Sequence, residues 1–110
     1  MYNIEQFQAL NKPECFVLTQ HSRKRLFERG ISIEDVEKVF NCGQIIEDYP
    51  DDFPFPSCLI FAMIGKRAIH VCASISDGFI YLITAYIPDS TRWKSDYITR
   101  IKENNDKELI

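Results

Sequence analysis

The sequence predicts an α+β fold in which two N-terminal helices pack on a four-stranded antiparallel β-meander and a short helix follows at the C-terminus. Two capped amphipathic segments come first, and strand-like segments separated by very short turns come after them. At 110 residues, of which 45% are hydrophobic, the chain is long enough for one core and too short for two. We therefore expect a single domain over residues 1–110, with an N-terminal arm at 1–17 and a frayed tail at 103–110.

The two helices are indicated by their capping residues. Residues 1–17 are weakly patterned, and we expect only a short helix or an arm there. Thr19 is a good N-cap for the first helix, and Gly30 can take the left-handed conformation that ends it. Ser32 and Asp35 resemble the capping box of a second helix, whose apolar stripe follows directly.

Strands are predicted where β-branched and aromatic residues are dense, namely at 44–49, 57–64, 67–75 and 79–87. The turns Gly65-Lys66 and Ser76-Asp77-Gly78 are short enough to join the last three strands as hairpins. An antiparallel meander follows from this spacing. Residues 93–102 are expected to form the terminal helix.

The strand register has a consequence for the site. A three-residue turn between the last two strands places His70 opposite Thr84, with Tyr86 diagonal to His70 on the same face. The other face is then apolar and receives the helices; it holds Ile69, Val71, Ala73, Ile75, Phe79, Tyr81, Ile83 and Ala85. His70 is expected on the less covered face, part of which a terminal helix or a partner covers.

Composition excludes several classes of protein. The longest apolar run, 57–64, is far shorter than the ~20 residues that span a bilayer, and residues 1–10 lack a signal-peptide pattern. We expect a cytoplasmic protein that does not bind membranes. The four cysteines are single, without a C-x-x-C pair, so we expect reduced thiols, no metal and no cofactor.

Charge is unevenly distributed along the chain. The net charge of −3 argues mildly against a protein that coats nucleic acid. Residues 19–29, however, hold four basic residues against one acidic residue, whereas residues 47–52 hold four acidic residues. The basic segment can line a cleft that binds an anion. Alternatively, the charges of both segments can simply face solvent.

The basic helix is the most informative segment. At ~100° per residue, His21, Arg25 and Arg29 lie within an arc of about 80° on one face. An imidazole beside two guanidinium groups is suited to binding phosphate and moving protons.

Three motifs carry a resemblance to a known family. They are T-x-H-x-x-x-R-x-x-x-R-G-I-S at 19–32, R-A-I-H-V at 67–71 and I-T-A-Y-I-P-D at 83–89, followed by Trp93. Together, over roughly residues 17–101, they resemble a bacterial domain-of-unknown-function family of short proteins. Its members look like RelE-type toxins and are often accompanied by a YgiT-type zinc-finger antitoxin, and related domains occur at the ends of large polymorphic toxins.

The order of elements is also similar to the fold shared by barnase, colicin D and RelE, whose members are largely metal-independent ribonucleases. This resemblance implies a RelE-like domain and raises the expectation of RNA cleavage, although a fold by itself assigns no mechanism. The chain contains no zinc-finger segment, so the antitoxin that the resemblance implies would be a separate protein.

Metal-free RNA cleavage needs a base for the ribose 2′-hydroxyl, an acid for the leaving oxygen and cations for the phosphate. His21 and His70 are the two histidines of the chain, and the resemblance places both in its motifs as first choices for acid and base. Tyr86 would orient the phosphate or donate a hydrogen bond. Arg25 and Arg29 would bind the phosphate, with Thr84 beside them.

Structural roles remain open for the same residues. His21 can form a hydrogen bond to a neighbouring backbone group, and His70 can be a half-buried strand histidine paired with Thr84. Arg29 can stabilise the C-terminal end of its helix through its positive charge. The alternative function is a non-catalytic module that binds protein or RNA; a hydrolase acting on another phosphate ester is a third reading. Whether the two histidines share one site, and the oligomeric state, are not determined by sequence.

Overall fold

The structure is a computed structural model and describes residues 1–102. Its helices are α1 (Ile4–Ala9), α2 (Gln20–Glu28) and α3 (Ile33–Cys42), with a 3₁₀ turn at Pro13–Cys15. Its strands are β1 (Phe16–Val17), β2 (Gln44–Tyr49), β3 (Ser57–Ile64), β4 (Arg67–Ser76) and β5 (Phe79–Tyr86). The α+β class is confirmed. The expected frayed tail at 103–110 lies outside the described residues.

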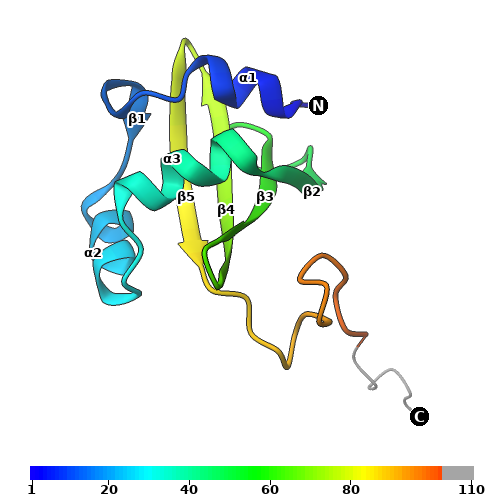
Figure 1. The fold of residues 1–110 in the computed structure, drawn as a ribbon. Coiled ribbons are helices and arrows are strands. Elements are labelled where there is room, and N and C mark those ends of the chain that lie inside the picture. Colours follow the sequence, from blue (N-terminus) through cyan, green and yellow to red (C-terminus); the bar gives the residue numbers. More distant parts are fainter. Residues whose placement is uncertain (103–110) are drawn as a thin grey trace.

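The sheet has five strands in the order β1-β5-β4-β3-β2 (Figure 1). Strands β2 to β5 form the predicted antiparallel meander. The expectation of a four-stranded, purely antiparallel sheet is wrong, because β1 pairs in parallel with β5 through Phe16 and Val17. A two-residue strand held by backbone bonds leaves no alternating pattern in the sequence from which it can be predicted.

The helices begin where the sequence predicts. The Thr19 side chain accepts a hydrogen bond from the Ser22 N–H, and Ser32 and Asp35 form a full capping box for α3. Gly30 ends α2 with φ of 67°, a conformation that glycine adopts without strain. Within residues 1–102, no helix is long and apolar enough to cross a membrane.

The main core lies between the sheet and α3, which crosses one face of the sheet (Figure 1). Val36, Val39 and Phe40 are the fully buried residues of α3. The segment expected to be an arm contributes to this core, because Phe7 of α1 is fully buried and stacks on Phe40 with ring centroids 5.4 Å apart. We call this side of the sheet the helix face and the opposite side the open face.

The predicted register of the β4–β5 hairpin is wrong. The turn has two residues, Asp77 (φ 52°) and Gly78 (φ 79°), as a type I′ hairpin requires, so Ser76 pairs with Phe79. A bulge beside Cys72 shifts the register again, and His70 lies opposite Tyr86 instead of Thr84.

This register reverses the sides of part of β5. Ile80 and Leu82 are buried in the helix-face core, whereas Phe79, Tyr81 and Ile83, which were expected there, are not part of it. Tyr81 and Ile83 instead line a cavity on the open face. The prediction holds for β4, whose Ile69, Val71 and Ala73 are all buried in the core.

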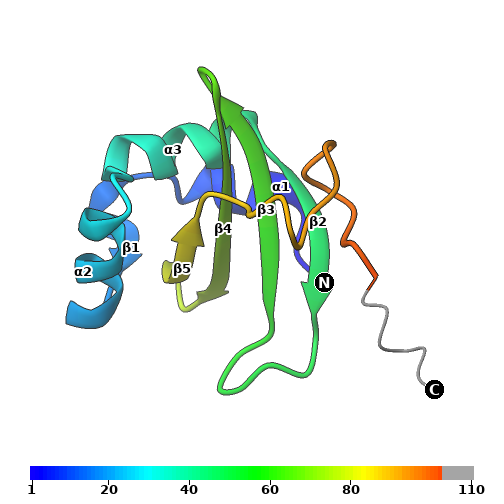
Figure 2. The same cartoon turned by 90° about the horizontal axis from the view of Figure 1, so that it is seen from below.

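The predicted C-terminal helix does not form. Residues 93–100 make a turn closed by a bridge between Trp93 and Arg100. The Asp96 carboxylate accepts hydrogen bonds from the backbone N–H groups of Ile98 and Thr99, and Tyr97 has a φ of 62°. Because an aspartate that binds nearby N–H groups offers the backbone an alternative to a helix, the segment stays irregular. It crosses the open face from β5 toward β2 (Figure 2).

Candidate functional site

Helix α2 lies against the part of the β5 edge that β1 does not cover, and its polar residues hold it there. The Ser22 hydroxyl lies 3.4 Å from the Leu82 carbonyl oxygen and 3.3 Å from that of Ile83. One turn beyond Leu26, the Arg29 guanidinium donates to the Ala85 carbonyl oxygen at 2.8 Å. Since strand-edge carbonyls need donors, these contacts explain why the helix runs beside β5.

Arg29 and Thr84, two predicted substrate-binding residues, contact each other. The same guanidinium nitrogen of Arg29 that bonds Ala85 lies 3.2 Å from the Thr84 hydroxyl, to which it donates. Both groups therefore take part in the attachment of α2 to β5.

Arg67 of the R-A-I-H-V motif makes another internal contact. Its guanidinium donates to the Gly30 carbonyl oxygen at 2.9 Å and forms a 2.7 Å ion pair with Asp35. Burial acts to raise the pKa of Asp35, but hydrogen bonds from Ser32 and Arg67 and the Arg67 charge lower it overall. This contact ties the β3–β4 hairpin to the corner between α2 and α3.

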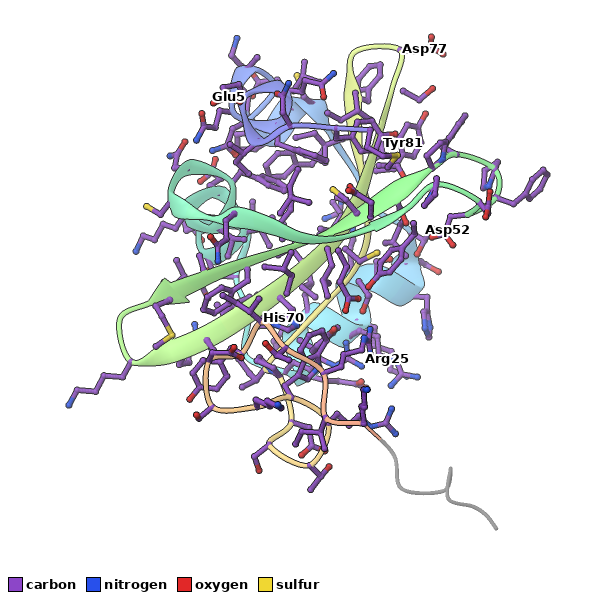
Figure 3. The ribbon with its side chains drawn as sticks, turned by 90° about the vertical axis from the view of Figure 1, so that its right-hand side faces the viewer. Glu5, Arg25, Asp52, His70, Asp77 and Tyr81 are labelled. Carbon is purple, nitrogen blue, oxygen red and sulfur yellow. The ribbon has the colours of Figure 1, made fainter. Side chains whose placement is uncertain are left out.

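His21 lies at a different place from Arg29. Together with β1, β5 and the loop after β2, it lines a cavity of about 520 Å³, within the usual range of small-molecule sites. The polar residues of the lining are Thr19, His21, Ser22, Asp52, Ser74 and Tyr81. Figure 3 shows Asp52 and Tyr81 apart from His70, which lies beside the C-terminal segment.

Arg25 lies one turn after His21 on α2, so the two side chains are neighbours on the helix surface. The Arg25 side chain is exposed. Within residues 1–102 its guanidinium forms no ion pair, whereas Lys24 beside it pairs with Glu28 at 4.0 Å. His21 therefore places an imidazole on the cavity wall, and Arg25, which does not itself line the cavity, provides a cation one helical turn away.

His70 is fully buried under the C-terminal segment. Its Nε2 donates to the Tyr97 carbonyl oxygen at 2.7 Å, and its Nδ1 lies 3.2 Å from the Tyr86 hydroxyl, from which the neutral ring accepts. Trp93 meets the ring edge-to-face at 4.5 Å. Burial lowers the pKa of His70, although the Tyr97 bond and the charge of Glu47 oppose this.

Tyr86 shares the His70 cluster and not the cavity. Its hydroxyl bonds His70, and burial raises the pKa of this phenol. The two residues lie directly opposite each other on β4 and β5. The structure thus brings two of the predicted catalytic residues together, but in a closed cluster.

A bidentate ion pair holds the C-terminal segment on the sheet. The Arg100 guanidinium donates to both Glu47 carboxylate oxygens, at 2.9 and 3.0 Å, and lies 4.5 Å from the Trp93 ring centre. Burial acts to raise the pKa of Glu47, but the bonds from Arg100 and Tyr49 lower it overall. Trp93 is only 3% exposed, as expected for a lid over the sheet.

The structure therefore separates the predicted site residues into three groups. His21 lines the cavity with Arg25 one helical turn away, Arg29 and Thr84 join α2 to β5, and His70 and Tyr86 form the buried cluster. Asp52, Ser74 and Tyr81 line the cavity without having been predicted as site residues. Nothing in their local pattern brings them together, since the loop after β2 must first fold toward β5. Within residues 1–102, no group of three or more His, Cys, Asp or Glu side chains is arranged to hold a metal ion.

Comparison with known proteins places the chain in a family. No curated protein and no solved structure matches it. One family profile, described as "Domain of unknown function (DUF4258)", matches residues 18–87, from the start of α2 to just beyond β5. This match includes α2, the β5 edge and the cavity lining from β4 and β5, and it spans more than half of the sequence. The chain therefore belongs to the DUF4258 family.

Proposed function

We propose that the protein is a toxin-like, metal-independent endoribonuclease, held in check by a separate antitoxin protein. The observation that supports this proposal is the pairing of His21, on the cavity wall, with Arg25, one helical turn away and without an ion partner in residues 1–102. Neutral imidazole is the usual general base near pH 7, and guanidinium binds phosphate bidentately.

In the proposed reaction His21 takes the proton of a ribose 2′-hydroxyl. The 2′-oxygen attacks the adjacent phosphorus, the bond from phosphorus to the 5′-oxygen breaks, and the leaving oxygen takes a proton from solvent. The products are a 2′,3′-cyclic phosphate and a 5′-hydroxyl end. Arg25 stabilises the negative charge that grows on the phosphoryl oxygens.

The test is cleavage of labelled RNA by the full chain in EDTA, with the product ends identified. We expect His21→Ala to lower the rate by about 10²–10⁴-fold, the usual contribution of a general acid or base. Lys24→Ala is the matched control, because Lys24 is exposed on the same helix and does not line the cavity. Equal cleavage by wild type and His21→Ala would show that the activity comes from elsewhere.

Expression provides a second readout. Induction of the wild-type chain is expected to slow growth, and His21→Ala and Arg25→Ala are expected to relieve the effect. His70 variants are unsuitable for this purpose, because that side chain is fully buried in the fold.

One observation favours the alternative, a non-catalytic module that binds protein or RNA. Both ring nitrogens of His70 are occupied by Tyr86 and Tyr97, which leaves one histidine on the cavity. This alternative predicts a saturable complex without turnover at any pH. The salt dependence of that complex would show whether the partner is a nucleic acid.

A further inference from the structure

The cavity beside His21 is lined by both polar and apolar side chains. Thr19, His21 and Ser22 of the α2 region lie on one side, and the loop after β2 contributes Asp52 and Phe55. Val17, Leu82 and Ile83 make up much of the apolar wall. A flat apolar ligand with polar edges fits such a lining better than a purely charged one does.

Ser74 provides an unused polar group in this lining. It is only 2% exposed and lies on the open face of β4, directly opposite Tyr81 of β5. Its hydroxyl makes no side-chain hydrogen bond within residues 1–102, and it lines the cavity. The Ser74 oxygen is not sealed off inside the protein, so water in the cavity can reach it and a ligand there can replace that water. A ligand with a polar edge would satisfy this hydroxyl.

Asp52 provides a fixed acceptor at another point of the lining. One carboxylate oxygen accepts a hydrogen bond from the hydroxyl of Ser57, a residue that is fully buried at the start of β3. Ser57 is in turn 3.8 Å from the Cys72 sulfur, which donates to it. The carboxylate is therefore held in one orientation, and its remaining lone pairs can accept only from N–H or O–H groups.

Aromatic rings line the same cavity. Phe55 and Tyr81 lie with ring centroids 5.5 Å apart and a 46° angle between their planes. Rings of this kind bind flat heterocycles by stacking, because every nucleobase has a π-face. Because both rings belong to the cavity lining, a ligand in the cavity would contact them.

We propose that this cavity is a nucleobase pocket that selects guanine. The proposal rests on the proposed ribonuclease function, because the base would belong to the RNA substrate. Binding of guanine can nevertheless be measured without cleavage. It assigns the substrate preference of the enzyme: cleavage on the 3′ side of guanosine, with the base in the cavity and the following phosphate near His21 and Arg25.

Guanine is chosen by the chemistry of its edge. A carboxylate only accepts, and guanine is the RNA base with two adjacent donors, N1–H and the N2 amino group, on its Watson–Crick edge. On the same edge adenine and cytosine place an acceptor nitrogen next to their amino group, and uracil places a carbonyl on each side of its N–H. These acceptors repel the carboxylate of Asp52. The Ser74 hydroxyl can donate to the O6 or N7 acceptor of guanine.

The test is calorimetric titration of the full chain with the four nucleoside 3′-monophosphates. We expect guanosine 3′-monophosphate to bind at least tenfold more tightly than the other three. Asp52→Asn should weaken guanosine binding at least tenfold, because an amide places a donor against the donors of the base. Asp51→Asn is the matched control, since it makes the same change one residue earlier, at a position that does not line the cavity.

Asp52→Asn also changes the hydrogen bond to Ser57, so this variant can lose its fold. A second variant therefore tests the pocket without that contact. Ser74→Ala removes only the unpartnered hydroxyl, and we expect it to weaken guanosine binding about fivefold while the melting temperature stays the same or rises. Equal affinity for all four nucleotides, no saturable binding, or an unchanged preference in folded Asp52→Asn would each overturn the proposal.

The outcomes separate this inference from the proposed function. Guanosine-selective binding without RNA cleavage would support the pocket and overturn the ribonuclease. Cleavage by His21 without any preference for guanosine would support the ribonuclease and overturn the pocket.

Discussion

Replacement of His70 by alanine is expected to destabilise the protein strongly and so to distinguish a structural histidine from a catalytic one. The variant loses two hydrogen bonds, to the Tyr97 carbonyl oxygen at 2.7 Å and to the Tyr86 hydroxyl at 3.2 Å. It also loses ring contacts to Trp93 and Phe61, whose centroids lie 4.5 and 5.8 Å from that of His70. All of these partners remain in place around an empty volume.

The magnitude follows from these contacts. Each net hydrogen bond contributes about 1 kcal/mol, and an edge-to-face aromatic contact adds roughly 0.5–1.5 kcal/mol. With a cavity left in a fully buried position, we expect His70→Ala to lower the free energy of unfolding by about 3–5 kcal/mol. This is a large part of the roughly 5–15 kcal/mol by which the free energy of unfolding favours the folded state of a typical domain.

Urea unfolding, followed by the fluorescence of Trp93, measures the effect at pH 7. His21→Ala is the control; its side chain is exposed, so the change should stay within about 0.5 kcal/mol. A loss of less than about 1 kcal/mol in His70→Ala would refute the reasoning, because it would mean that the buried contacts do not stabilise the fold.

The same residue predicts a pH dependence. Because the folded state lowers the pKa of His70 below its ordinary 6.5, the unfolded chain binds more protons than the folded one between those two values. Stability is therefore fully present above pH 6.5 and falls as the pH decreases toward the folded pKa, with a slope of at most about 1.4 kcal/mol per pH unit. The lowered pKa values of Asp35 and Glu47 act below 4.5, so the interval from pH 5 to 6.5 isolates the histidine. His70→Ala should remove this slope, and a slope that persists would contradict the assignment.

Three further substitutions test the contacts that position the cavity and the C-terminal segment. Arg29→Ala should cost about 1–3 kcal/mol in urea unfolding, because the Ala85 carbonyl oxygen loses a charged donor, and a neutral result would show that α2 stays in place without it. Gly43→Ala should cost at least about 2 kcal/mol, since an added Cβ would lie 2.3 Å from the Val39 carbonyl oxygen and 2.8 Å from that of Phe61; an unchanged melting temperature would rule out this clash. Arg100→Ala should lower stability by about 1 kcal/mol and shift Trp93 emission to the red, an effect that Lys94→Ala should not reproduce.

Local signals account for the parts of the fold that the sequence predicts correctly. The capping residues Thr19, Ser32 and Asp35 act within three residues of themselves, so the sequence alone determines where α2 and α3 begin. The bounds of β2 and β3 likewise follow from their composition and from the turns beside them.

Features that depend on distant contacts could not be predicted in the same way. The β4–β5 register depends on a two-residue Asp77-Gly78 turn and on a bulge beside Cys72, each of which shifts the pairing by one residue. The segment after β5 is irregular, and its Tyr97 carbonyl oxygen accepts a bond from His70, 27 residues earlier in the chain. Asp52 is one of the four acidic residues at 47–52, and its role was not evident because its partner Ser57 lies in the next strand.

The motif residues fall into two groups according to what their side chains contact inside the fold. Arg29, Arg67 and His70 each bond backbone carbonyl oxygens, so a structural role explains them. His21 and Arg25, from the same helix motif, have no side-chain hydrogen bond or ion pair within residues 1–102, and His21 lines the cavity. A histidine and an arginine that contribute little to the fold are the residues for which function is the stronger explanation. Substituting His21 or Arg25 should therefore lower the proposed RNA cleavage at constant stability, whereas substituting the other three should lower stability first.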